Sequence, residues 1–101
     1  MLEEKRKKYI EQIKKKEMNK KKKEEYIRII KKFITKENFY NMSLKEYIEF
    51  VKLLKKREYS VNYRKGILNT VNKFMKEYYP EIYKEIKENT INYNGNIYIK
   101  Q

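Results

Sequence analysis

The clearest structural signal in the chain is SLKEYIEFVKLLKKR, at residues 43–57. Ser43 and Glu46 form a capping box, in which the serine hydroxyl accepts a hydrogen bond from the Glu46 amide and the glutamate reaches back to the serine amide. Met42 and Tyr47 occupy the two positions of a hydrophobic staple. The helix that follows is apolar around more than half of its circumference, which is typical of a helix at the centre of a bundle.

Helical patterns flank this segment on both sides. Apolar residues recur at helical spacing from residue 24 to about residue 36. Ser60 is the predicted N-cap of a further helix whose apolar face runs to residue 78. Pro80 fits the first position of a short last helix, at residues 80–88. We therefore expect an all-α (mainly) fold, a small helical bundle of four to five helices with a short C-terminal β-hairpin.

Gly66 stands out because it lies inside the helix predicted to start after Ser60. A glycine in a helix interior costs about 1 kcal/mol relative to alanine. The position therefore indicates a close helix crossing in the first place, and otherwise the close approach of a ligand.

The two ends of the chain differ from its middle. Residues 1–23 have a thin apolar stripe among many charges and are predicted as a basic N-terminal helical extension. Residues 24–89 form the predicted bundle domain, and residues 90–101 form a hairpin or tail in which Asn94-Gly95 suits a type I′ turn. Such a hairpin must pack on the helices or on a partner, because an isolated one is marginally stable.

The composition argues against catalysis. The chain has no His, Cys, Asp, Trp or Ala, and so lacks most of the side chains that perform acid–base, nucleophilic and metal chemistry near neutral pH. No metal-ligand spacing and no glycine-rich phosphate loop is present. We expect a non-catalytic protein without a cofactor. The absence of cysteine, of a signal peptide and of a membrane span leads us to expect a cytoplasmic location, with no membrane partner.

The charge indicates a negatively charged partner. The 101 residues include 27 Lys and Arg against 14 acidic residues, a net charge of +13. Only four of the cations are Arg, the residue best suited to reading guanine, so the charge favours contacts with phosphates over contacts with bases. A strongly AT-rich genome is an alternative source of the many Lys, Asn, Ile and Tyr residues, although it explains the charge imbalance less directly.

Two groups of residues are candidates for binding nucleic acid. The first surrounds a helix junction, where helix N-terminal amides add to the attraction of a phosphate and aromatic rings interleave with cations. Its members are Lys55, Lys56, Arg57, Tyr59, Ser60, Asn62, Tyr63, Arg64, Lys65, Asn69 and Lys73. The second, a secondary basic arm, consists of Lys20, Lys21, Lys22 and Lys23. Asn62 is the predicted reader of an adenine edge. The alternative for the first group is a solvated junction between core helices without a binding role. The alternative for the basic arm is a solvated extension.

The pattern over residues 24–79 resembles the core-binding domain of tyrosine recombinases, the SAM-like helical domain that precedes the catalytic domain in phage integrases. The shared features are a helix from Tyr26 to Phe33, a helix opening Ser-Leu-x-Glu-Tyr-Ile at Ser43, and a helix opened by Ser60 and ending near Phe74. The resemblance implies that this last helix lies against the DNA backbone and major groove. It also implies a stand-alone module without strand cleavage, because the catalytic residues of that family include His.

We therefore predict a small non-catalytic DNA-binding protein of a phage, virus or mobile element, with duplex DNA favoured over RNA. A protein-interaction module that masks a nucleic-acid-binding host protein, and an RNA-binding protein, remain as alternatives.

Overall fold

The computed structural model describes residues 2–93 and 96–100. Within them, the elements are α1 (Leu2–Lys15), α2 (Lys20–Phe33), α3 (Leu44–Lys56), α4 (Val61–Tyr78), α5 (Pro80–Asn89), β1 (Thr90–Tyr93) and β2 (Asn96–Ile99). The predicted mainly helical bundle with a C-terminal hairpin is confirmed. Asn94 and Gly95, for which a type I′ turn is predicted, lie outside the described residues.

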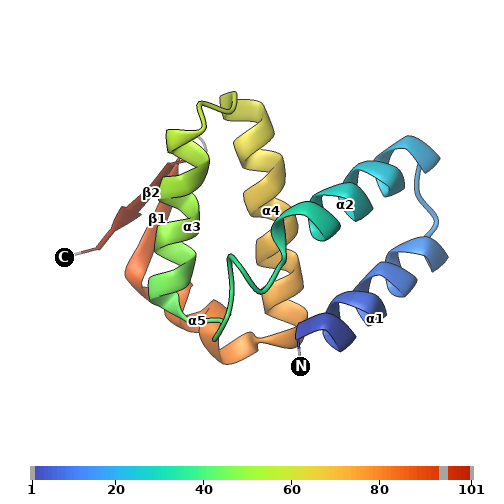
Figure 1. Ribbon diagram of the computed structural model, residues 1–101, viewed down its shortest axis with the longest axis horizontal. Coiled ribbons are helices and arrows are strands. Elements are labelled where there is room, and N and C mark those ends of the chain that lie inside the picture. Colours follow the sequence, from blue (N-terminus) through green and yellow to red (C-terminus); the bar gives the residue numbers. More distant parts are fainter. Residues whose placement is uncertain (1, 94–95, 101) are drawn as a thin grey trace.

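The longest helix, α4, and not the helix predicted after Ser43, stands at the centre of the fold (Figure 1). The antiparallel α1–α2 pair crosses it on one side, α3 runs along its other side, and α5 lies at its foot. Five apolar α4 side chains are fully buried: Ile67, Leu68, Val71, Phe74 and Met75. This continuous apolar stripe makes α4 the helix on which the others pack.

Helix α1 is packed into the same core. Its residues Leu2, Tyr9, Ile10 and Ile13 are buried, and the Tyr9 ring meets Phe74 of α4 edge-on with centroids 5.5 Å apart. The described part of the predicted extension, residues 2–23, therefore comprises a docked helix, a link and the first turn of α2.

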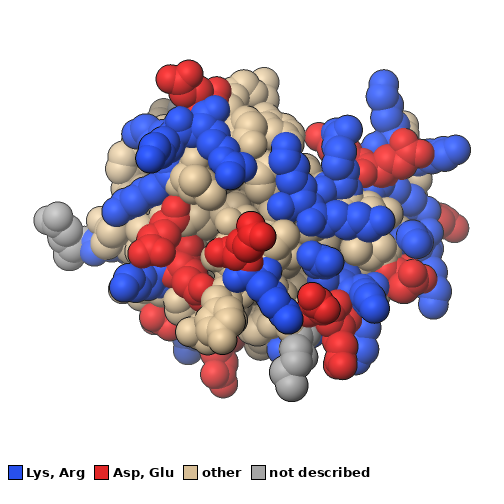
Figure 2. Space-filling model, in the orientation of Figure 1, with Lys and Arg blue, Asp and Glu red and all other residues tan. Residues whose placement is uncertain are grey.

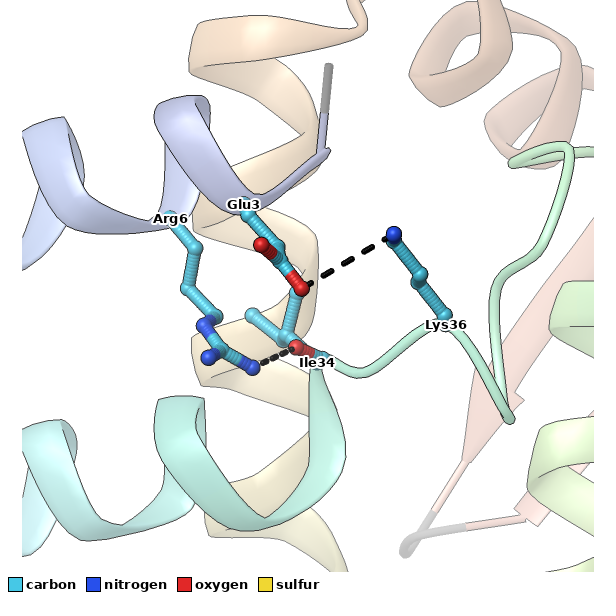
Figure 3. Close-up of polar contacts among 4 residues, drawn as sticks. All are labelled: Glu3, Arg6, Ile34 and Lys36. Atoms are coloured by element: carbon cyan, nitrogen blue, oxygen red, sulfur yellow. Dashed lines mark hydrogen bonds and ion pairs between the residues drawn. The ribbon is translucent and has the colours of Figure 1, made fainter.

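Polar contacts fix the start of α1 against the end of α2 (Figure 3). Arg6 Nη1 donates a hydrogen bond of 3.0 Å to the Ile34 carbonyl, which α2 leaves unpaired at its C-terminal end. Lys36 Nζ and Glu3 Oε1 form an exposed ion pair at 3.9 Å. These contacts hold α1 antiparallel to α2 at the end far from the link that joins them.

The predicted serine cap of α3 is confirmed, but its glutamate is used differently. Ser43 Oγ accepts from the Glu46 amide at 3.2 Å. The Glu46 carboxylate accepts from the amides of Tyr40 and Asn41, at 2.7 and 2.9 Å, rather than from the Ser43 amide. The reason lies at buried Met42, whose φ of 48° turns the chain so that the two earlier amides face the carboxylate.

The hairpin packs on the helices through one face. Thr90 is buried, and Ile97 of β2 is half-buried against the core. The opposite face leaves Ile91, Tyr93 and Tyr98 exposed. No helix within the described residues is long and apolar enough to cross a bilayer.

Candidate nucleic-acid interface

Cations cover much of the surface, and few of them meet a carboxylate. Figure 2 shows Lys and Arg spread across the face in view, most densely over the α1–α2 pair, with acidic and uncharged surface between them. Among residues 2–93 and 96–100 there are three ion pairs, all exposed, and they engage Lys14, Lys36 and Lys84. The positive charge is therefore largely left to solvent or to a partner.

The secondary basic arm is the first turn of α2. The expected start at residue 24 is four residues too late, because Asn19 accepts from the Lys21 amide at 2.8 Å and caps the helix there. Lys23 Nζ turns back and donates to the Lys14 carbonyl at the end of α1, at 3.0 Å. Lys23 thus has a structural role, whereas Lys20, Lys21 and Lys22 are exposed.

A groove between α2 and α4 brings the two predicted groups together. It has a volume of about 120 Å³ and is lined by Lys22, Glu25, Tyr26, Ile29, Gly66, Asn69 and Thr70. Lys73 Nζ lies 5.4 Å from the centre of the Tyr26 ring, which places a second cation beside the groove. Lys22 of the arm and Asn69 of the junction group therefore share one site, although 47 positions separate them in the sequence.

The close helix crossing predicted from Gly66 is wrong. A Cβ atom built on Gly66 meets nothing within 4 Å, so the groove is open there. No neighbouring helix requires a glycine at this position.

One face of α4 presents the polar members of the junction group. Asn62, Lys65, Asn69 and Lys73 follow one another at three- and four-residue spacing, and all are exposed. Asn69 lines the groove, so this face forms one side of it. We call these four residues, together with Lys20, Lys21 and Lys22 of α2, the α2–α4 face.

The corner between α3 and α4 carries the rest of the junction group. Lys55, Lys56 and Arg57 are exposed at the end of α3. Ser60 is confirmed as an N-cap, since its Oγ accepts from the Tyr63 amide at 3.2 Å. Glu58 adopts a φ of 58°, the left-handed conformation in which a chain commonly leaves a helix.

Two aromatic members of the group are engaged inside the protein. Tyr59 and Tyr63 are half-buried, lie edge-on to each other at 5.1 Å, and both meet Phe33 of α2 edge-on. Lys32 Nζ lies 5.9 Å from the Tyr59 ring. These tyrosines tie the corner to α2 and do not form a free stacking platform.

Arg64 also differs from its neighbours. It precedes Ile67 and Leu68 by three and four residues and so lies on the core-facing side of α4. It is half-buried, and its Nε has no hydrogen-bond partner within the described residues. Proximity in sequence grouped Arg64 with Lys65, but the helical period separates them.

Sequence reasoning missed the cations of the middle and end of α2. Arg28, Lys31 and Lys32 line a shallow surface hollow with Glu24 and Ile27. The signal was available, because these residues occupy the polar side of the helix opposite the buried Ile29, Ile30 and Phe33.

The part of the chain that the structure describes offers no candidate metal centre. No cluster of three or more acidic side chains able to hold a metal ion occurs there. Burial raises the pKa of Tyr47 to about 12, which moves this phenol away from reactivity at neutral pH. The chain matches no protein-family model, no curated protein and no solved structure.

Proposed function

We propose that this protein binds duplex DNA through the sugar-phosphate backbone, using the α2–α4 face and the adjacent cations Lys55, Lys56 and Arg57, and that it does so without catalysis. The resemblance to the recombinase core-binding domain adds one prediction to this proposal, which is how α4 approaches DNA. It is supported by how the charges are placed on the helices.

The observation that carries the proposal is an asymmetry among helix N-termini. Helices α1, α3 and α5 have glutamates in their first turns, which stabilise the positive end of the helix dipole. The first turns of α2 and α4, the two helices that form the groove, contain no acid. The first turn of α2 is instead four lysines, and the exposed Lys20, Lys21 and Lys22 are each unfavourable by about 0.3–1 kcal/mol at such a position. Cations placed where they oppose stability favour a binding role.

The dimensions of the protein suit a short stretch of duplex. Its principal extents are 40 × 29 × 22 Å, and one turn of B-DNA measures about 34–36 Å. A protein of this size lies along about one turn and reaches roughly six phosphates through the cations of the α2–α4 face and the corner.

The first test is the dependence of binding on salt. Fluorescence anisotropy with a labelled duplex two helical turns long should give a log–log slope of affinity against NaCl concentration near −5, as expected for about six phosphate contacts. A flat salt dependence, or no binding at low salt, contradicts the proposal and favours the protein-interaction alternative. Stronger binding to a structured RNA of equal length contradicts the preference for DNA.

The second part of this test locates the surface. A variant with Lys22→Gln, Lys65→Gln and Lys73→Gln should bind more weakly, with a slope about three units shallower, because each lost phosphate contact removes about one unit. The matched control carries Lys45→Gln, Lys84→Gln and Lys87→Gln, which removes the same charge from α3 and α5. The control should retain the wild-type slope. Equal losses in both variants mean that binding follows net charge and has no defined face.

A further inference from the structure

Gly66 has no structural reason to be a glycine. It lies in the interior of an 18-residue helix, where glycine is destabilising by about 1 kcal/mol relative to alanine. The space beside it is empty to 4 Å, so an alanine would meet no neighbouring atom. Its carbonyl already accepts a hydrogen bond from Thr70 Oγ1 at 2.9 Å. The position is thus an unfilled indentation in the surface of α4.

The surroundings of Gly66 combine an apolar floor with a charged rim. Tyr26 and Ile29 of α2 line the groove opposite Gly66, and Ile29 is buried. Lys22 stands on the α2 side, and Lys73 stands beside the Tyr26 ring on the α4 side. The two cations therefore approach the same groove from different helices.

Glu25 determines which part of a DNA strand suits the groove. Glu25 is one of the residues that line the groove, and its negative charge disfavours a phosphate on the floor. A deoxyribose ring carries no charge and presents an apolar edge, which matches the aromatic and aliphatic floor. The negatively charged phosphates on either side of that sugar are then placed toward the rim, where the lysines lie.

We propose that Gly66 is a DNA-contact position, at which one deoxyribose packs against the bare backbone of α4 while its flanking phosphates contact Lys22 and Lys73. This inference rests on the proposed function and specifies how one strand lies in the groove. A methyl group at position 66 projects into a groove of only about 120 Å³ and takes the place of the sugar. Glycine at this position leaves that space to the ligand.

The test is Gly66→Ala, measured for both stability and binding. Helix propensity predicts that Tm rises by about 4 °C, since alanine fits the empty space without a clash. The affinity for the labelled duplex should fall about tenfold, and the salt slope should stay unchanged because no charge is altered. Val61→Ala, at the exposed start of α4 outside the groove, is the control for a stiffer helix and should bind as the wild type does.

A second variant in the same groove should raise the affinity for DNA, where Gly66→Ala should lower it. Glu25→Gln removes the carboxylate that faces the bound strand and should raise the affinity about threefold. Glu85→Gln makes the same change on α5, away from the groove, and should raise it much less.

The outcomes separate this inference from the proposed function. If Gly66→Ala is stabilised and binds as tightly as the wild type, the inference is overturned while the salt slope still supports DNA binding. If Gly66→Ala lowers Tm, the glycine serves packing and the inference is also overturned. If the wild type does not bind duplex DNA at all, the proposed function and the inference fail together.

Discussion

At the scale of single residues, Tyr47 of α3 is held by both packing and a hydrogen bond. Its ring is fully buried, and its hydroxyl donates to Asn72 Oδ1 of α4 at 2.8 Å. Burial of the phenol disfavours the charged phenolate and raises the pKa of Tyr47 to about 12, against an ordinary value near 10. One hydroxyl thus links α3 to α4 and also makes the fold sensitive to alkali.

The free energy of unfolding should fall as the pH rises from about 10 to about 12. In this range the unfolded chain has lost the Tyr47 proton, whereas the folded protein still holds it because its pKa is about 12. Below pH 10 both states are protonated and the contribution of the neutral phenol is fully present. The difference between wild type and Tyr47→Phe, from urea unfolding at each pH, should change by about 2–3 kcal/mol across the range.

Comparison with Tyr47→Phe isolates the effect, because all other titrating groups are present in both proteins. Burial also raises the pKa values of Tyr9, Tyr78 and Tyr79, and their contributions cancel in the difference. A difference that is constant from pH 8 to pH 12 would contradict the buried, neutral state of Tyr47.

At the scale of elements, the start of α3 depends on a single carboxylate. Glu46 accepts hydrogen bonds from two amides of the preceding loop while its own amide donates to Ser43. The loop from α2 to α3 also buries Phe39 and Met42 in the core. The carboxylate therefore holds both the helix end and a buried part of the loop.

Glu46→Ala should lower the free energy of unfolding by about 1–2 kcal/mol, because two amides lose a charged acceptor in a partly solvated site. The matched control is Glu49→Ala, at an exposed position of the same helix, which should change the stability by less than about 0.5 kcal/mol. Urea unfolding of both variants tests this. Equal effects would show that the loop contacts contribute nothing.

The sequence predicts the start of a helix correctly where a local interaction fixes that start. Ser43, Ser60 and Pro80 each mark a helix start that depends only on nearby atoms, and each is found where it was predicted. The start of α2 was missed, because its first turn contains only lysines and thus lacks an apolar period. Gly66 was misread, because its effect depends on whether a helix faces it, which is a tertiary property.

The candidate site was predictable only in part, for the same reason. The sequence identifies the exposed cations of the corner and of α4, but it does not show that Lys22 and Asn69 share a groove. It also grouped Arg64 with surface residues, although Arg64 lies on the core-facing side of α4. A binding surface built from distant segments depends on how helices cross, and no local pattern encodes the crossing.

At the scale of the whole molecule, the charge opposes folding. The net charge is +13, and the few ion pairs of the described residues are exposed. Exposed ion pairs contribute little to the free energy of unfolding, so they do not offset the repulsion among the cations. Salt screens this repulsion over about 10 Å at 0.1 M.

We therefore expect Tm to rise with NaCl by on the order of 5 °C between about 20 and 300 mM, while DNA affinity falls over the same range. Thermal melts followed by circular dichroism measure the first effect. The variant with Lys22→Gln, Lys65→Gln and Lys73→Gln should melt higher than the wild type at low salt and gain less from added salt. A Tm that falls with NaCl would mean that attractions, rather than repulsions, dominate the surface.

The docking of α1 on α4 has a consequence for biosynthesis. Tyr9 and Gln12 find their partners at Phe74 and Tyr78, so the contacts that seat α1 join residues more than 60 positions apart. The α1–α2 pair leaves the ribosome well before the helix that receives it has emerged. The nascent chain consequently exposes this lysine-rich, amphipathic pair of helices for several seconds at ordinary elongation rates. Folding can be completed only after the second half of α4 emerges, because that segment carries the partners of α1.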